Sequence, residues 1–196
     1  MNYTKISEEE ILKWLQENLD EKRYLHSLGT AQCAKELADK YGLDGKKAYI
    51  AGLLHDCAKC FSNENLLQIM NEKLAPEPDE LINPKTWHAP VSAYIARREF
   101  GLEDETIISS IRWHTLGKLD MTDFEKIIFL ADKIEPKTRQ KDYVKDIRAS
   151  LNDEHVLNKA IYLCYKETIK SLVVRDLKIC PATIDIYNHL NDLLKQ

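Results

Sequence analysis

Histidines and aspartates occupy positions where a helical pattern would normally place apolar side chains. His26 shares a helical face with Cys33 and Leu37, and His55 lies above Ala51. Four more residues lie over apolar or small neighbours in the same way: Asp56, His88, His114 and Asp132. A single inward histidine is more often a hydrogen-bonded core residue, and an inward carboxylate is costly unless it is paired. Six such groups in one small core favour a divalent metal, which would offset the cost of all of them.

The predicted ligand set consists of imidazoles and carboxylates and needs no thiolate. These ligands suit iron, manganese or zinc in a site with open coordination positions, rather than a closed structural zinc. Because Asp56 directly follows His55, its carboxylate can offer one oxygen to each of two metals. A dinuclear centre acidifies a bound water and clamps the attacking and leaving oxygens of a phosphoryl displacement. The pattern therefore predicts hydrolysis of a phosphate compound.

The other histidines and the cysteines have simpler interpretations. His155 and His189 have polar or charged neighbours on their helical faces, so we expect both at the surface. Cys57 and Cys60 form an isolated CxxC motif, whereas a zinc ribbon needs a second pair and a redox motif needs a βαβ context. We therefore expect these thiols to take no part in the metal chemistry. The odd total of five cysteines agrees with a reducing compartment.

Helices must position these groups, because apolar residues recur at helical period along nearly the whole chain. The pattern predicts helices over about 11–19, 24–41, 46–57, 63–73, 87–101, 104–115, 122–135, 153–175 and 182–195. Residues 75–84 contain three prolines and are expected to form a loop. No segment alternates like a strand, and no repeat or linker divides the chain. We therefore predict an all-α fold, one compact helical bundle spanning 1–196.

Charge and hydropathy limit the partners and the compartment. The chain has 196 residues and a formal net charge of −4, which argues against nucleic acid as a partner. No apolar run is long enough to span a membrane, and the polar N-terminal residues do not resemble a secretory signal. We therefore expect a cytoplasmic protein with neither a membrane nor a nucleic-acid partner. The oligomeric state stays open, a homodimer included.

One segment departs from the acidic balance of the chain. Residues 133–148 carry six basic side chains against three acidic ones. Either this segment is a solvated helical face, or it receives an anionic ligand.

Several motifs resemble a known family. His26, then His55-Asp56 within LLHDCAK, then Asp132 resemble the H…HD…D pattern of the HD-domain metal-dependent phosphohydrolases. The segments RYLHS, WHAP, WHTLG and ADKIEP follow in an order that resembles the YqeK subgroup of that family. The resemblance covers about residues 20–190 and implies an HD-domain fold. It also implies a bacterial symmetrical diadenosine tetraphosphate hydrolase that yields two ADP, with iron as the metal.

The resemblance further implies roles for individual residues. One metal would be held by His26, His55, Asp56 and Asp132, while His88 and His114 would complete a second metal site or contact phosphate. The residues expected to take part in catalysis are Asp56, Lys59, His88 and His114. The residues expected to contact the nucleotide substrate are His26, Lys59, His88, His114, Thr115, Asp132, Arg139, Lys178, Ile179, Cys180, Pro181, Ala182 and Thr183.

Other functions remain compatible with these residues. The same ligands would serve an HD phosphohydrolase of a nucleoside mono- or triphosphate or of a cyclic nucleotide, because only the pocket separates these substrates. A non-catalytic helical sensor of nucleotide or metal is another hypothesis, although such sensors tend to lose ligands and this set is intact. A plain interaction module would need six inward polar groups to be satisfied by chance.

Overall fold

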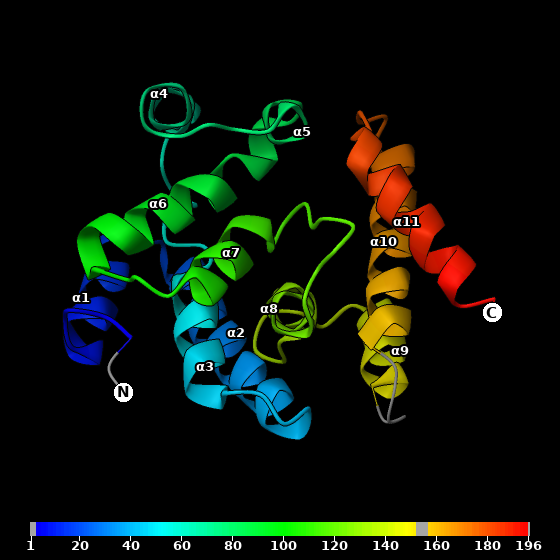
Figure 1. The fold of residues 1–196 in the computed structure, drawn as a ribbon, viewed down its shortest axis with the longest axis horizontal. Coiled ribbons are helices and arrows are strands. Elements are labelled where there is room, and N and C mark those ends of the chain that lie inside the picture. The colour runs from blue at the N-terminus through cyan, green and yellow to red at the C-terminus, as the bar shows by residue number, and fades with distance from the viewer. Residues whose placement is uncertain (1–2, 152–156, 196) are drawn as a thin grey trace.

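Every regular element in the described residues, 3–151 and 157–195, is a helix, which confirms the all-α prediction (Figure 1). The structure is a computed structural model. Its elements in chain order are α1 (Glu8–Asn18), α2 (Glu21–Lys40), α3 (Gly45–Leu54), α4 (Asn63–Lys73), α5 (Pro78–Leu81), the 3₁₀ helix η1 (Pro84–Thr86), α6 (His88–Phe100), α7 (Glu105–Trp113), α8 (Asp123–Ile134), α9 (Asp142–Ser150), α10 (Leu157–Val174) and α11 (Pro181–Leu193). Within those two ranges, no helix is long and apolar enough to cross a bilayer.

Side-chain caps set where many of the helices begin. Ser7 and Glu10 form a capping box at the start of α1, and Thr122 and Glu125 form another at the start of α8. Side-chain N-caps also begin α2, α3, α4 and α7. At the other end of α2, Gly42 adopts a φ of 69°, which ends the helix where the sequence predicts.

The end of α3 differs from the prediction. The helix was expected to continue to residue 57, but it ends at Leu54. Residues 55–60 instead form tight turns in which the N–H groups of Cys57 and Lys59 bond to carbonyls three residues earlier. Cys57 and Ala58 are buried although they are no longer helical. The apolar pattern in the sequence therefore continues past the end of the helix, which is why the helix was predicted to be longer. The HD pair therefore lies at a helix end rather than within a helix.

Two other segments were also predicted wrongly. Helix α9 was missed, because its buried apolar residues are only Val144 and Ile147 within a highly charged stretch. The predicted loop 75–84 contains the short helix α5 and the start of η1. The expected start of the long C-terminal helix at residue 153 lies outside the described residues, and α10 is described from Leu157.

Helix α2 packs along α3 and also against α8, while α7 contacts α3, α6 and α8 (Figure 1). The contact between α2 and α3 is close at Gly52, where an added Cβ would lie 2.8 Å from Ala31 Cα. This close approach brings the rings of His26 on α2 and His55 after α3 to a centroid separation of 5.2 Å. On the other side of α8, α10 packs against α8, α9 and α11.

Tyr165 on α10 holds the loop that follows α7. Its hydroxyl donates to Leu116 O at 2.7 Å, and its ring stacks on Phe129 of α8 with centroids 5.3 Å apart. Gly117 has a φ of 75°, and a side chain there would collide with the Tyr165 hydroxyl. This contact fixes the backbone just behind His114.

Candidate metal and phosphate site

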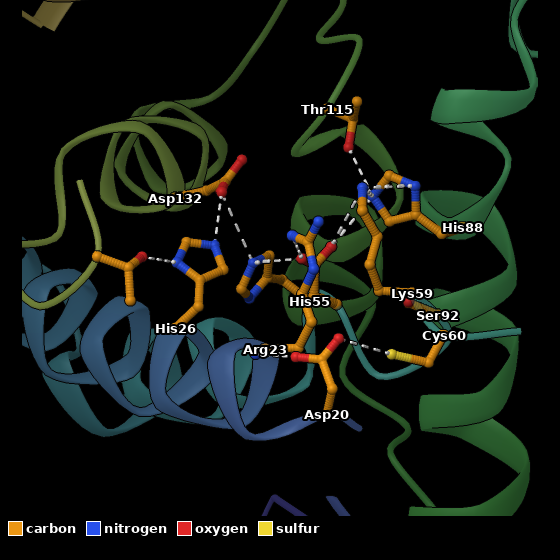
Figure 2. Close-up of polar contacts among 12 residues, drawn as sticks. Asp20, Arg23, His26, His55, Lys59, Cys60, His88, Ser92, Thr115 and Asp132 are labelled. Carbon is orange, nitrogen blue, oxygen red and sulfur yellow. Dashed lines mark hydrogen bonds and ion pairs between the residues drawn. The ribbon is translucent and has the colours of Figure 1, made fainter. Parts of the chain in front are cut away.

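Six buried polar side chains meet near the centre of the helical bundle, at 5 % exposure or less. They are the inward residues predicted from the sequence: His26, His55, Asp56, His88, His114 and Asp132. They come from α2, the end of α3, the first residue of α6, the residue after α7, and the last turn of α8. Figure 2 shows His26, His55 and Asp132 on one side of this cluster and His88 with Lys59 on the other.

His55 and His114 occupy equivalent positions at the ends of two helices. Each is a C-cap residue, and its Nδ1 donates to the carbonyl three residues earlier, Gly52 at 2.6 Å and Ile111 at 2.7 Å. Carbonyls in the last turn of a helix lack a helical partner and are free to accept such a bond. The bond fixes a proton on Nδ1, so Nε2 is the nitrogen of each ring that faces the site, and in the neutral ring it directs a lone pair there.

The carboxylate of Asp56 lies between two groups of histidines. Its Oδ2 lies 3.7 Å from His55 Nε2, whereas its Oδ1 lies 3.1 Å from His88 Nε2 and 3.4 Å from His114 Nε2. Two sets of three residues have ligand atoms within 4.8 Å of one another, and both include Asp56: His26, His55 and Asp56, and Asp56, His88 and His114. One oxygen faces each group, as a carboxylate that bridges two ions requires.

His26 is held between two carboxylates. Its Nδ1 lies 3.0 Å from Glu135 Oε1, and its Nε2 lies 2.9 Å from Asp132 Oδ1. Glu135 is fully buried and also accepts from the backbone N–H groups of Lys137 and Thr138, so its carboxylate cannot turn away. Burial lowers the pKa of His26, but the bonds to Asp132 and Glu135 outweigh it and raise that pKa. The raised pKa favours the ring with both nitrogens donating, Nδ1 to Glu135 and Nε2 to Asp132. Loss of the Nε2 proton would leave that nitrogen and Asp132 Oδ1 side by side as two ligand atoms for a cation.

His88 has different neighbours. The Lys59 ammonium donates to its ring, with Nζ 2.9 Å from Nε2, and the Thr115 hydroxyl lies 3.1 Å from the same Nε2. Thr115 also lies 2.8 Å from His114 Nε2. This side of the cluster therefore presents hydroxyl and ammonium donors, and its one carboxylate is the shared Asp56.

Burial keeps the imidazoles of His55 and His88 neutral, and neighbouring groups keep the carboxylates of Asp56 and Asp132 ionised. Burial lowers the pKa of His55 to about 3 and that of His88 to about 4. Burial opposes the ionisation of Asp56, but His55, Lys59 and His88 hold its pKa well below the usual range. For Asp132, Lys133 and His26 outweigh burial in the same way. Neutral imidazole and ionised carboxylate are the forms that bind metal.

Unpaired buried atoms test whether the site fits a metal. Among the described residues, the buried side-chain atoms without a hydrogen-bond partner include His55 Nε2 and Asp56 Oδ1. Leaving such atoms unpaired costs about 1–3 kcal/mol each. Because both belong to the three-residue groups, a divalent ion in either group would satisfy at least one of them. The residues present therefore fit divalent metal ions.

The cluster forms the floor of a cavity of about 290 Å³. Four cationic side chains and two carboxylates are among its lining residues: Arg23, Asp56, Lys59, His88, His114, Thr115, Asp132, Lys133, Arg139 and Tyr143. Arg139 Nη2 donates to Asp132 Oδ1 at 2.8 Å, and Arg23 Nη1 lies 3.4 Å from Asp56 Oδ2. If a metal ion binds these two carboxylates, the guanidinium groups of Arg139 and Arg23 become available to bind an anionic substrate.

The structure brings six of the thirteen predicted substrate residues to the lining of this cavity, but neither His26, which lies in the buried cluster, nor the C-terminal segment. Lys59, Thr115 and Arg139 line it, whereas no residue of 178–183 does. That segment lies beside α5, where Cys180 Sγ is 3.8 Å from Asp79 O, and its contact with a nucleoside stays a prediction. His189 is exposed, as predicted, and His155 lies outside the described residues.

The CxxC thiols lie apart from the cavity lining. Cys57 is fully buried, and its Sγ points to the carbonyl of Ser92 at 3.6 Å. Burial raises the pKa of its thiol to about 12, so it stays protonated. Cys60 is exposed, with Sγ 3.8 Å from Asp20 Oδ2.

Three residues at the site received no role from the sequence: Arg23, Glu135 and Tyr143. Arg23 and Glu135 lie within the motifs RYLHS and ADKIEP, three residues from His26 and Asp132 respectively. This spacing, which brings two residues to the same side of a helix, could have indicated that both lie near the site. Lys133 was counted in the basic stretch 133–148, and it lines the cavity together with Arg139. Another basic residue of that stretch, Lys145, pairs on the surface with Asp142. Part of the stretch is therefore a solvated helical face, and another part lines the cavity where an anionic ligand would bind.

Comparisons with known proteins agree with this geometry. The HD domain model matches residues 23–137. A Bacillus subtilis protein named bis(5'-nucleosyl)-tetraphosphatase, symmetrical, is 39% identical over 94% of this chain and 98% of its own. A Staphylococcus aureus protein of the same name is 38% identical over 89% of this chain and 90% of its own. A crystal structure from Clostridium acetobutylicum, described as a predicted HD superfamily hydrolase involved in NAD metabolism, has a TM-score of 0.88 and 36% identity, covering 95% of this chain and 98% of that one.

These similarities extend over the residues that build the site. The HD match begins at Arg23 and ends just after Glu135, so it includes all six clustered side chains. The relatives extend the similarity to nearly the whole chain. This chain is therefore a hydrolase of the HD-domain family, in the group that contains the symmetrical bis(5'-nucleosyl)-tetraphosphatases.

Proposed function

We propose that this protein hydrolyses diadenosine tetraphosphate with one water to two molecules of ADP. The observation that carries the proposal is the 38–39% identity to relatives named for this activity, over most of both chains. The site supports the proposal, because two groups of three residues that could each bind a metal ion share Asp56, and the cavity above them is lined by four cationic side chains.

In this proposal the two groups hold two divalent ions. His26, His55, Asp56 and Asp132 would hold one ion, and Asp56, His88 and His114 would hold the other. Ions there would acidify a water and offset the negative charge of the phosphates. The imidazole and carboxylate ligands suit iron, manganese or zinc alike. We propose iron because the resemblance to the YqeK subgroup implies it, with manganese and zinc as alternatives.

The side chains of the cavity would bind and orient the polyphosphate. The Lys59 Nζ lies 3.9 Å from Asp56 Oδ1 and beside His88, so its ammonium can stabilise negative charge that develops on a phosphate bound there. Arg139 and Lys133 flank Asp132 and would contact the neighbouring phosphate. Thr115 would donate its hydroxyl to a phosphate oxygen instead of to the histidines.

The reaction balances without a further reactant. The water oxygen bonds to one of the two inner phosphorus atoms, and the P–O bond to the oxygen that bridges them breaks. One ADP carries the new oxygen, the other leaves with the bridging oxygen, and the two protons of the water pass to the product phosphates or to the solvent. No electron transfer is involved.

The experiment is turnover of a nucleotide panel on protein purified without chelator. The panel holds diadenosine tetraphosphate, ATP, AMP, a cyclic nucleotide and NAD, with products identified by mass spectrometry in ¹⁸O-labelled water. We expect ADP as the sole product from the tetraphosphate, half of it carrying one ¹⁸O. ATP and AMP as products would contradict symmetrical cleavage. Binding without turnover of any nucleotide would favour the sensor.

Metal identity is tested on the same preparation. Chelated protein is reloaded separately with iron, manganese or zinc, and metal content and turnover are measured for each. We expect iron to give the highest turnover at equal occupancy. Higher turnover with manganese or zinc would overturn the proposal of iron while leaving the reaction intact.

A further inference from the structure

A second cavity opens beside the metal site. It has a volume of about 400 Å³ and lies along α10, from Cys164 to Arg175, against Lys141 and Tyr143 at the start of α9. We call it the α10 groove. Its lining and that of the metal-site cavity share Lys133 and Tyr143, so the two hollows adjoin.

The α10 groove is cationic. Four basic side chains line it and one acidic side chain, Glu167, opposes them. Lys170 pairs with Glu167 at 2.6 Å, and Lys133 pairs with Asp132 of the metal site. For Lys141 and Arg175, no ion pair is present within the part of the chain that the structure describes. The groove therefore suits an anion that continues out of the metal site.

The size of the proposed substrate requires such a continuation. Cleavage at the centre of the tetraphosphate places two phosphates and a nucleoside on each side of the bond that breaks. The metal-site cavity, at about 290 Å³, is at the lower limit of the roughly 300–1,000 Å³ that one drug-sized ligand occupies. Two nucleoside diphosphates cannot both lie within it.

We infer that the α10 groove binds the second nucleoside diphosphate half of the substrate, an inference that rests on the proposed function. Lys133 and Lys141 would contact its phosphates as the chain leaves the metal site, and the Arg175 guanidinium farther along α10 would contact the uncharged nucleoside. The half-buried ring of Tyr143 lines both cavities, with Lys141 Nζ 5.9 Å from its centroid, so these two residues form the wall at the junction. The groove lining includes no residue of 178–183, so it is separate from the segment predicted to contact the first nucleoside.

The experiment measures ADP binding by calorimetry and Michaelis kinetics with diadenosine tetraphosphate. The variants are Lys141→Glu, Arg175→Glu and the double variant, all at exposed positions, with Lys145→Glu as the control. Lys145 is also exposed on α9, pairs with Asp142 and does not line the groove. We expect wild type to bind two ADP per chain and the double variant one. KM for the tetraphosphate should rise roughly 10-fold or more in the double variant, as expected for lost electrostatic contacts, while kcat changes much less.

The outcomes separate the inference from the proposed function. The control should keep both ADP molecules and a KM within about 2-fold of wild type. One ADP per chain in wild type, or a double variant with unchanged KM, would overturn the inference while tetraphosphate turnover leaves the function standing. Wild type without tetraphosphate turnover would overturn the proposed function itself. Unchanged metal content in the double variant excludes an indirect effect through the metal site.

Discussion

Each side of the metal site has two histidines and shares Asp56 with the other, but the residues around those histidines differ. The HD half consists of His26, His55 and Asp132 together with Glu135, and the lysine half consists of His88, His114, Lys59 and Thr115. Asp56 belongs to both. Two buried carboxylates hold His26 of the HD half, and His55 has carboxylate oxygens 3.7 and 3.8 Å from its Nε2, whereas an ammonium and a hydroxyl contact the histidines of the lysine half.

This difference indicates a division of labour within one cluster. Carboxylates next to imidazoles favour a cation, so the HD half should hold its ion more tightly. Ammonium and hydroxyl donors oppose a second cation and favour phosphate oxygens. The lysine half should therefore serve a weaker ion and the charge of the substrate. The following predictions test this contrast, from the largest expected effect to the smallest.

The largest effect is expected at the residue that both halves share. Asp56→Asn keeps the side-chain shape but removes the negative charge, so we expect metal loss from both halves and turnover at the background rate. Elemental analysis measures the metal content and a tetraphosphate assay measures turnover. Asp123→Asn, the same substitution at an exposed position, is the control. Two ions retained per chain in Asp56→Asn would contradict the shared role.

A smaller effect is expected when only the lysine half is changed. His114→Ala should keep at least one metal while turnover falls on the order of 10²-fold, mainly in kcat, because the contact strengthens in the transition state. Lys59→Ala should lower turnover similarly without any change in metal content. Metal analysis beside kinetics checks both. If His114→Ala lost all metal, His114 would belong to the tighter metal site, which contradicts the weaker metal binding assigned to the lysine half.

The HD half can be weakened without touching a ligand. Glu135→Gln keeps the shape but loses the charge that holds His26, so we expect metal affinity to fall roughly 10–100-fold. Glu125→Gln is the matched control, because Glu125 is a buried glutamate that binds Lys118 and Ser109 instead. Gly29→Ala should act in the same direction as Glu135→Gln, since its Cβ would collide with the Glu135 carboxylate. Equal metal affinity in wild type and Glu135→Gln would leave Glu135 with a packing role alone.

The smallest effect is expected at the thiols. The double variant Cys57→Ser and Cys60→Ser should keep metal content and turnover within a few-fold, because neither thiol is directed into the cavity. Protein folding is checked in parallel by circular dichroism, since Cys57 is fully buried. Loss of metal from a folded double variant would place sulfur among the ligands and overturn the ligand set.

The sequence alone determined the helical class and the six clustered side chains. Helical periodicity reports which face of each helix is buried, so an inward His26 or Asp132 is visible without knowledge of its partners. The adjacency of His55 and Asp56 also predicted a carboxylate shared by two ions. Periodicity could not show that α3 ends before the pair, because buried residues continue into the turns that follow.

Only the tertiary structure decided which groups meet. Glu135 lies 109 residues from His26, and the contact depends on how α2 packs against α8. The division of the two Asp56 oxygens between the halves depends on the sharp turn after α3. The α10 groove likewise arises where α8, α9 and α10 come together, so the basic stretch 133–148 could not by itself indicate which of its cations face a cavity. Local patterns set the burial of each helix face, whereas packing between distant helices sets distances and directions.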